Sequence, residues 1–396
     1  MSLTFLCIAT YRKGDEFLRE LRAQGCRVLL LTEEKLRDAD WPRDAIDEFY
    51  FVRRDMAEHD IRKGAAHLAR HERIDRIVAL DDFDVELAAM LREYLFVPGM
   101  GETTARAFRD KLAMRRRARS AGLPCPDFVH ALNNDQINDW TRTVSPPWVL
   151  KPRSQAAALG IRKLHNASEL WSAIEALGDS HADYLIEQFI PGDVFHVDSI
   201  VFDRAVWLAV ASQYRTPPFT VAHEGGIFVT QTLPRGDSRG EALKTSNARV
   251  LNAFGLVRGA SHTEFIRATD GRWYFLETSA RVGGAFIVDV AEAASGLNLW
   301  REWAKVEIAG EEGRYEARPL RDHCAGIVLT LARQKDPDLS SFSDPEIVMR
   351  IRKHHHAGLI VASSDCSRIS EILDDYAQRF TREFQAFAPA PERPTE

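Results

Sequence analysis

Continuous apolar runs separated by amphipathic segments occupy the first hundred residues. The runs with strand-like composition are residues 3–9, 27–32, 49–52 and 77–80. The segments with helical spacing of apolar positions are residues 16–23, 61–71 and 85–94. Buried strands that alternate with amphipathic helices are typical of a parallel sheet covered on both faces. The pattern therefore predicts a Rossmann-like parallel α/β domain over residues 1–100.

Three aspartates follow the fourth apolar run. Asp81, Asp82 and Asp84 stand where that strand ends and the next helix begins. Ligands of parallel α/β sheets bind beyond this edge, so the three side chains could line a cleft. They could instead solvate the strand end or cap the helix, which is the more common role of such residues. Both interpretations stay open.

The pattern changes after residue 100. A basic helix is expected at residues 105–121, because Gly122 and Pro124 form a strong stop signal, and a polar linker at residues 133–147. The following runs alternate between apolar and polar positions and predict strands at residues 148–151, 184–189, 195–202, 206–212, 262–267 and 273–278. Asp270-Gly271 indicates a hairpin between the last two. This region is predicted to be α+β with a mostly antiparallel sheet.

A small α+β extension is expected at the C-terminal end. Its predicted elements are strands at residues 323–331 and 357–363 and an amphipathic helix at residues 369–387. The final residues are polar and contain prolines, so we expect a disordered tail. The predicted domains are thus residues 1–100, 101–310 and 311–396.

Charge and cysteine usage narrow the function classes. The formal net charge of -6 gives no electrostatic reason to expect a nucleic-acid or membrane-surface partner. No apolar run reaches the ~18 residues that span a bilayer, and the opening residues read as a strand and not as a signal peptide. Five scattered cysteines without a CxxC pair predict neither a zinc site nor a disulfide framework, and the odd count fits a reducing cytosol. A cytoplasmic protein is expected.

Lys151 ends an apolar strand just before Pro152 and a loop of small residues, 153–161. A lysine in this position either reaches solvent or offers a positive charge to a phosphate oxygen. Backbone N–H groups of a small-residue loop can approach phosphates closely. Small-residue loops are common, so both interpretations of Lys151 stay open at this point.

Glu264 and Glu277 lie in two apolar strands that the Asp270-Gly271 turn would make neighbours. Two adjacent carboxylates in an apolar setting repel each other unless a cation lies between them, and Mg²⁺ prefers oxygen ligands of this kind. By strand alternation Phe275, Glu277 and Ser279 would share a face. Surface ion pairs with nearby arginines are the alternative interpretation.

Taken in order, three groups of residues resemble motifs of the ATP-grasp superfamily. The first is Asp110-Lys111 with the helix that ends in AGLPCP, residues 121–126. The second is VLKP, residues 149–152, with its loop and then IEQFIPG, residues 186–192. The third is HTEF, residues 262–265, with FLETSARVGG, residues 275–284. The resemblance covers nearly the whole chain and suggests the carboxylate–amine ligase branch, related in fold to biotin carboxylase and carbamoyl-phosphate synthase.

The resemblance implies an ATP-grasp domain of two α+β subdomains, with a lid subdomain at about residues 123–192, that binds ATP and Mg²⁺ or Mn²⁺. Its implied phosphate ligands are Lys111, Lys151 and the loop from Ser154 to Gly160. Glu187, Gln188, Phe189 and Ile190 would line the adenine and ribose pocket. Glu264, Glu277 and Ser279 would hold the metal. Arg281 and Lys151 would be the catalytic cations, with Arg281 stabilising the carboxylate substrate and its acyl phosphate.

The chain departs from the superfamily pattern at three places. Ser279 stands where relatives usually carry Asn, which leaves the number of metal ions open. The phosphate loop has alanines in place of several glycines. Val194 stands where many relatives have a ribose-binding glutamate, and either Asp193 or His196 would have to replace it.

The function implied is ATP-dependent activation of a small carboxylate as an acyl phosphate, followed by coupling to an amine. Biotin-carboxylase-like activation of bicarbonate and a non-catalytic ATP-binding module are the alternatives. Residues 214–228 combine prolines, glycines and aromatic residues and predict a substrate-recognition loop, or a purely structural turn. Both substrates are expected to be small molecules of unassigned identity. The apolar face of the C-terminal helix is compatible with a homodimer.

Overall fold

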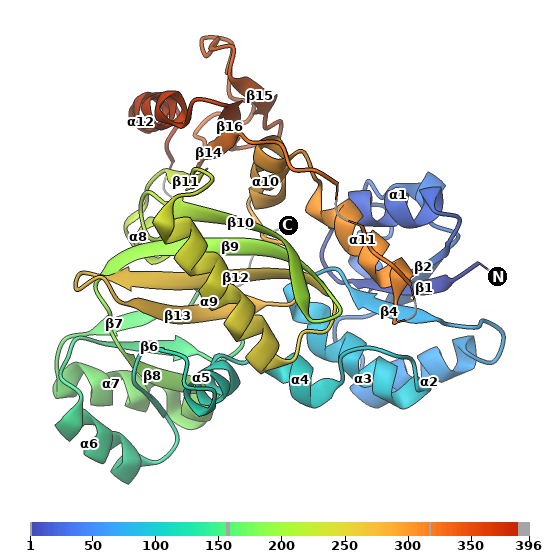
Figure 1. Ribbon diagram of the computed structural model, residues 1–396. Coiled ribbons are helices and arrows are strands. Elements are labelled where there is room, and N and C mark those ends of the chain that lie inside the picture. The colour runs from blue at the N-terminus through green and yellow to red at the C-terminus, as the bar shows by residue number, and fades with distance from the viewer. Residues whose placement is uncertain (1, 156–158, 312, 317, 387–396) are drawn as a thin grey trace.

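The computed structural model describes the chain except for residues 1, 156–158, 312, 317 and 387–396 (Figure 1). The predicted disordered tail lies outside the described residues. Three sheets account for the strands, and the helices cover their faces. Among the described residues, no helix is long and apolar enough to cross a membrane.

The N-terminal sheet is parallel and has the strand order β3-β2-β1-β4. Its strands are β1 Thr4–Ala9, β2 Arg27–Glu33, β3 Glu48–Val52 and β4 Arg76–Ala79. The helices are α1 Asp15–Ala23, α2 Glu58–Leu68 and α3 Val85–Leu95, with η3 Asp82–Asp84 at the end of β4. Every side chain of β1 is buried, as expected for a strand covered on both faces. The Rossmann-like α/β prediction is confirmed.

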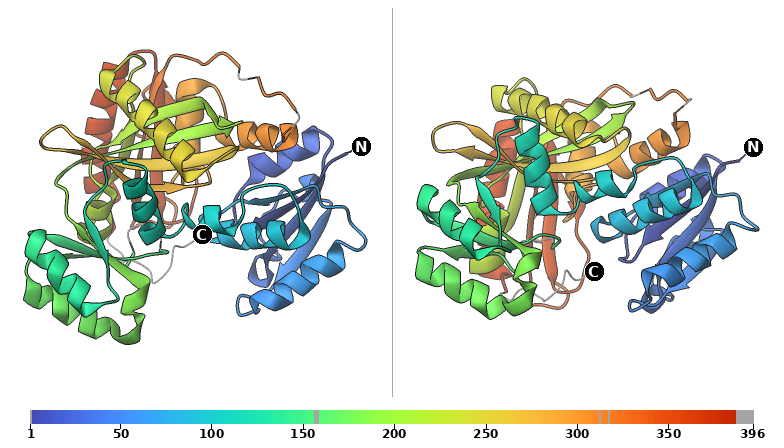
Figure 2. Two further views of the ribbon diagram at one scale, coloured as in Figure 1. Left: turned by 60° about the horizontal axis from the view of Figure 1, so that its bottom comes forward. Right: turned by 90° about the horizontal axis from the view of Figure 1, so that it is seen from below.

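A second, small antiparallel sheet carries Lys151. Its order is β5-β8-β6-β7, with β5 Phe128–His130, β6 Trp148–Pro152, β7 Arg162–Leu164 and β8 Tyr184–Gln188. Helices α6 Asn134–Thr143 and α7 Ala167–Leu177 cover it. In Figure 2 this unit and the N-terminal domain stand on either side of the larger sheet.

The prediction of a polar linker at residues 133–147 is wrong, because helix α6 occupies most of this segment. The Asn133 side chain caps this helix by accepting a hydrogen bond from the Gln136 N–H group. Ile137 is fully buried, and the Trp140 ring lies 6.1 Å from that of Trp148. Two apolar anchors one turn apart were enough to fix a helix whose other residues are polar.

The largest sheet has eight strands in the order β13-β12-β9-β10-β11-β14-β16-β15. Its strands are β9 Gly192–Phe202, β10 Ala205–Tyr214, β11 Phe228–Thr232, β12 Gly259–Ala268, β13 Trp273–Ser279, β14 Cys324–Leu331, β15 Ile347–Arg350 and β16 His356–Ser363. The associated helices are α8 Pro218–Glu224, α9 Ser238–Phe254, α10 Ile287–Ser295, α11 Leu299–Ala309 and α12 Cys366–Glu383. Helix α9 packs on one face through Leu243, Val250 and Phe254. The opposite face of β9, β12 and β13 carries the polar residues described below.

The basic helix predicted at residues 105–121 is wrong in its first part. The chain forms α4 Glu102–Arg106 and a separate helix, α5 Lys111–Ser120. The Asp110 carboxylate caps α5 by accepting hydrogen bonds from the N–H groups of Leu112 and Ala113. The break therefore places Lys111 at the start of a helix.

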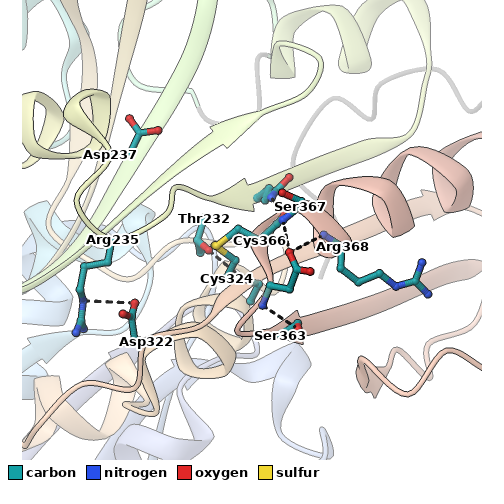
Figure 3. Close-up of a disulfide and its surroundings, with 12 residues drawn as sticks. Thr232, Arg235, Asp237, Asp322, Cys324, Ser363, Cys366, Ser367 and Arg368 are labelled. Carbon is teal, nitrogen blue, oxygen red and sulfur yellow. Dashed lines mark hydrogen bonds and ion pairs between the residues drawn. A yellow bond between two sulfur atoms is a disulfide. The ribbon is translucent and has the colours of Figure 1, made fainter.

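The sequence expectation of no disulfide is also wrong, because Cys324 and Cys366 form one (Figure 3). The two residues are 42 positions apart, and no local motif joins them. Cys324 begins β14, where it pairs with Ser363 of β16, and Cys366 begins α12 three residues later. Strand pairing brings the sulfur atoms together, which cysteine spacing alone cannot show.

Candidate active site

A cavity of about 510 Å³ lies where the two smaller units meet the large sheet. The edge of the N-terminal sheet contributes Lys13, Asp81, Asp82 and Phe83. The small sheet and its loop contribute Lys151, Gln155 and Leu159. The large sheet and the chain after it contribute Glu264, Glu277, Ser279 and Arg281. Most residues predicted as phosphate or metal ligands thus lie around one cavity.

Glu264 and Glu277 are direct cross-strand partners on β12 and β13. Glu264 accepts a hydrogen bond from the Tyr214 hydroxyl at 2.9 Å, and Glu277 lies 3.2 Å from the Lys111 ammonium. Burial opposes ionisation of Glu277, but Lys111 and Lys151 outweigh it and hold its pKa at about 2. The two carboxylates therefore lie beside each other, as predicted from the Asp270-Gly271 turn.

The predicted common face of Phe275, Glu277 and Ser279 is only partly right. The β12–β13 register shifts between Glu264 and Phe265, so that Leu276 is the extra residue of β13. Phe275 consequently packs into the core under α9, while Glu277 and Ser279 line the cavity. Alternation fails here because a bulge reverses the facing of the residues before it.

Lys111 links the predicted metal-ligand pair to the predicted phosphate loop. Its ammonium donates to the Gln155 carbonyl at 2.6 Å, besides its ion pair with Glu277. Arg109 donates to the Ser154 carbonyl on the same loop. Gly160 has a φ of +70°, a conformation that glycine adopts without strain. The alanines of this loop, residues 156–158, lie outside the described residues.

Lys151 is buried in a cluster with Glu187 and Arg115. Its ammonium lies 2.7 Å from one oxygen of Glu187, and Arg115 lies 2.6 Å from the other. Burial lowers the pKa of Lys151 to about 8, although Glu187 acts in the opposite direction. Burial likewise opposes charge on Glu187, but the two cations outweigh it and lower its pKa. Glu187 thus holds Lys151 in place from behind the cavity wall.

The residues predicted to bind adenine and ribose do not line the cavity. Gln188 ends β8, and the Phe189 ring lies 3.8 Å below the Lys163 ammonium, with Ile190 packed near Val194. None of these three, nor Glu187, is among the residues that line the cavity. Their assignment to the nucleotide stays a prediction.

Of the ribose alternatives, neither side chain lines the cavity. Asp193 is exposed, and His196 is fully buried, where it contacts the Asp198 carboxylate at 2.6 Å and the Thr230 hydroxyl at 2.8 Å. Val194 itself lines the cavity, beside Tyr214 and Phe228. The wall at this position is apolar.

A buried polar network supports Glu264 from below. One oxygen of the Asp198 carboxylate is hydrogen-bonded to His196, and the other lies 2.9 Å from a ring nitrogen of His262. The second ring nitrogen of His262 lies 3.5 Å from Glu264. Burial disfavours charge on His262, but Asp198 outweighs it and raises the pKa of His262 to about 9. His196, Asp198 and His262 are close enough to ligate a metal ion, but their own hydrogen bonds already join them.

Arg281 faces Asp82 across the cavity. The Arg281 Nε atom and the Asp82 Oδ1 atom are 4.0 Å apart, and both are buried without a hydrogen-bond partner. Asp82 binds Arg109 through its other oxygen at 3.0 Å, and Arg281 donates to the Val282 carbonyl at 2.7 Å. Unsatisfied buried polar atoms of opposite charge are suited to a ligand that carries both an acceptor and a donor.

Both roles left open by the sequence occur among the three N-terminal aspartates, and Asp81 has both, since it also caps η3 by accepting a hydrogen bond from the Phe83 N–H group. Asp81 and Asp82 line the cavity, and Lys13 forms an ion pair with Asp81. Asp84 instead accepts hydrogen bonds from the backbone and the hydroxyl of Thr10, and burial raises its pKa to about 7. It fixes the strand end and does not line the cavity.

Residues 214–228 form the apolar side of the cavity. Helix α8 begins with Pro218 at its first position, and the lining residues are Tyr214, Pro217, Pro218, Phe219, Val221 and Phe228. The segment therefore lines the cavity, and its role in substrate recognition stays a prediction.

Sequence reasoning missed Lys13, Arg109 and His262 as cavity residues. Arg109 stands two positions before Lys111, and Lys13 follows the first strand at its carboxyl end. The edge rule applied to Asp81 could have found Lys13. Nothing local marks His262, which was noted only as part of the HTEF segment.

Comparisons with known proteins identify a family and relatives that this chain resembles. Residues 144–289 match the model of the ATP-grasp domain. This chain contains an ATP-grasp domain. The L-arginine-specific L-amino acid ligase of Bacillus subtilis is 25% identical over 59% of this chain, and the match spans 58% of that protein's length. The D-alanine–D-alanine ligase of Stutzerimonas stutzeri is 27% identical over 58% of this chain and 75% of its own.

The ATP-grasp fold extends over almost the whole chain. The crystal structure of the L-amino acid ligase from Bacillus licheniformis superposes with a TM-score of 0.75 and covers 98% of each chain at 18% identity. ATP-grasp enzymes use ATP and Mg²⁺, and the donor set of this site fits a magnesium ion. Two opposed carboxylates, Glu264 and Glu277, offer hard oxygen ligands with the Ser279 hydroxyl on the same strand face.

Proposed function

We propose that this protein is an ATP-dependent ligase that activates a small carboxylate as an acyl phosphate and couples it to an amine, releasing ADP and phosphate. The observation that carries the proposal is the meeting of two groups at one cavity. The metal-ligand pair Glu264 and Glu277, with Lys111, lies on one side, and Arg281 with Asp82 lies on the other.

In the first step, a carboxylate oxygen of the substrate attacks the γ-phosphorus. The new O–P bond forms as the bond to the β-phosphate oxygen breaks, so ADP leaves with the bonding electrons. Lys111 and Lys151 would hold the phosphates, since both ammonium groups are anchored by carboxylates that fix their direction. A bound Mg²⁺ would neutralise charge on the transferring phosphoryl group.

In the second step, the amine nitrogen attacks the acyl carbon, phosphate leaves, and the nitrogen loses a proton to solvent. Arg281 is placed to stabilise negative charge on the acyl phosphate, because its Nε donor has no hydrogen-bond partner in the protein. The Asp82 carboxylate, whose Oδ1 atom is buried without a hydrogen-bond partner, suits a substrate ammonium group. Exclusion of water by the apolar wall of α8 would protect the acyl phosphate from hydrolysis.

The test is ADP release from Mg-ATP across a panel of amino acids and small carboxylates with amine acceptors. We expect particular pairs to drive turnover, with the amide product visible by mass spectrometry. Glu277→Gln should reduce kcat by at least about 100-fold, since it removes one charged ligand. Glu175→Gln, on the exposed surface of α7, is the matched control and should leave the rate unchanged.

Two outcomes would contradict the proposal. If Mg-ATP binds but no pair releases ADP, the protein is a nucleotide-binding module. If bicarbonate alone drives ADP release without amide formation, the reaction belongs to the carboxylase type.

A further inference from the structure

A second cavity, of about 420 Å³, lies between the N-terminal domain and the beginning of β12. It shares no lining residue with the candidate active site. Strand β4 and helix α3 border it on one side, α5 on another, and β12 with α11 on the third. Figure 1 shows α3 and α11 beside the N-terminal sheet. It is therefore a pocket at the junction of two structural units.

Arginine dominates the charge of this pocket. Five arginines and two glutamates line it, so its formal charge is +3. The arginines are Arg76, Arg92, Arg117, Arg204 and Arg258. They come from five different elements or turns, so the cluster is a product of the fold and not of one basic segment.

Both glutamates form ion pairs with the same arginine. Arg258 lies 3.2 Å from Glu307 and 3.8 Å from Glu311. Glu307 also accepts from the Trp303 indole at 3.0 Å. In the part of the chain that the structure describes, no carboxylate forms an ion pair with the other four guanidinium groups.

Backbone carbonyls orient three of those four groups without neutralising them. Arg92 donates to the carbonyls of Ile77 and Met100, Arg76 to those of Asp75 and Glu307, and Arg117 to that of Ala253. Burial lowers the pKa of Arg92 to about 10, and Arg258 adds to the effect while Glu307 opposes it. Arg92 remains charged at neutral pH, and among the described residues no carboxylate forms a direct ion pair with it.

A glycine makes room for one of these side chains. A Cβ atom at Gly99 would lie 2.7 Å from Arg92 Cδ, and the φ of +145° is itself unfavourable for other residues. The loop of residues 98–101 can therefore pass across the Arg92 side chain. Such a close crossing keeps the guanidinium in a defined position.

We propose that this pocket binds a small organic anion with two or more negative charges, such as a phosphate ester or a polycarboxylate. Guanidinium groups match the planar oxygen pairs of both kinds of anion. The volume suits a small metabolite. Leu256, Val257 and Met100 supply apolar surface for a carbon skeleton.

The proposed site lies along the same strand as the candidate active site. Gly259 and Ala260 of β12 line the anion pocket, while His262 and Glu264 line the active-site cavity. A bound anion would join α3, α5 and β12 by shared hydrogen bonds. We therefore expect it to raise the temperature of thermal unfolding, whether or not the protein is a ligase.

The test is isothermal titration calorimetry with citrate and, separately, pyrophosphate as probes. The double variant Arg117→Gln/Arg204→Gln keeps Arg92 and its structural bonds intact. Arg142→Gln, exposed on α6, is the matched charge control. Lys111→Met reports binding at the nucleotide site.

We expect the double variant to weaken binding at least about tenfold, as loss of charge-assisted hydrogen bonds would. Arg142→Gln should bind both probes like the wild type, and Lys111→Met should keep the binding that the double variant loses.

Citrate and pyrophosphate decide between carboxylate and phosphate chemistry. Equal binding by wild type and double variant would overturn the proposal, as would loss of binding in Lys111→Met with the double variant unaffected. Failure of both probes to bind the wild type would overturn it as well. Thermal unfolding of each variant without ligand shows whether the fold is intact.

Discussion

At the scale of single residues, Arg281 has geometry that lysine could not reproduce. One guanidinium nitrogen donates a hydrogen bond to the Val282 carbonyl. The Nε atom is buried without a hydrogen-bond partner, 4.0 Å from Asp82. A planar fork can hold its backbone contact and an anionic ligand at the same time. An ammonium at the end of a flexible chain would have to choose between them.

Arg281→Lys should therefore reduce kcat/KM about 100-fold or more while changing the unfolding temperature little. Steady-state kinetics and thermal melts check this together. Arg267→Lys, at an exposed position near the end of β12, is the control, and it should retain activity. Equal activity of the two variants would remove Arg281 from the reaction.

The buried carboxyl group of Asp84 makes the stability of the protein depend on pH. Burial raises its pKa from an ordinary 3.8 to about 7, although the Thr10 hydrogen bonds act in the opposite direction. The native state then binds a proton that the unfolded state has released between about pH 4 and pH 7. Stability from this group is present below pH 4 and falls as the pH rises through 7, by at most about 4 kcal/mol.

The Asp84→Asn variant cannot ionise and keeps an acceptor for the Thr10 N–H group. We expect its free energy of unfolding to change less than that of the wild type between pH 4 and 7. Urea denaturation at a series of pH values measures the difference. Parallel curves would show that Asp84 is charged in the native protein throughout this range.

At the scale of elements, the Cys324–Cys366 disulfide joins the first residue of β14 to the first residue of α12. The helix packs over β14 and β16 through Ile369, Leu373 and Tyr376. A covalent link across 42 residues restricts the unfolded chain, which stabilises a protein by typically about 2–4 kcal/mol.

Cys366→Ser should lower the unfolding temperature under oxidising conditions, and a reducing agent should do the same to the wild type but not to the variant. Differential scanning fluorimetry with and without dithiothreitol measures both effects. Cys125→Ser, which removes a free thiol, is the control. A wild type that does not respond to reducing agent would show that this link contributes nothing to stability.

Elements with strong local signals were predictable from the sequence, and those set by distant contacts were not. Strands β1, β2 and β12 were predicted because apolar runs and a turn mark them. Helix α6 was missed because most of its residues are polar and two buried anchors decide its conformation. The bulge at Leu276 and the disulfide have no local signal, since both depend on how strands pair.

The same distinction applies to the site. Glu264 and Glu277 could be paired because a hairpin turn joins their strands, and the pairing is confirmed by the register. The buried contacts of His196 could not be predicted, because Thr230 comes from a strand that is distant in sequence. The assignments of Gln188, Phe189 and Ile190 to adenine, and the domain boundaries, stay predictions.

At the scale of the whole molecule, the C-terminal segment completes the sheet that carries the candidate metal ligands. Strand β14 pairs with β11, and β11 pairs with β10, which pairs with β9. Thr230 of β11 contacts His196, which contacts Asp198 beneath His262 and Glu264. The C-terminal strands therefore support the candidate active site although none of their residues lines its cavity.

A chain that ends at residue 310 should consequently fail to form a stable ATP-binding unit. Its β11 would become an exposed edge, and α10 would lose the buried partners Ala325, Ile327 and Ile360. We expect this fragment to be insoluble, or to melt without cooperativity and to show no stabilisation by Mg-ATP. A chain that ends at residue 386 keeps every contact among the described residues and serves as the control. If the shorter fragment melted cooperatively and Mg-ATP raised its unfolding temperature as in the control, the C-terminal segment would be a separate domain and the sheet would not need it.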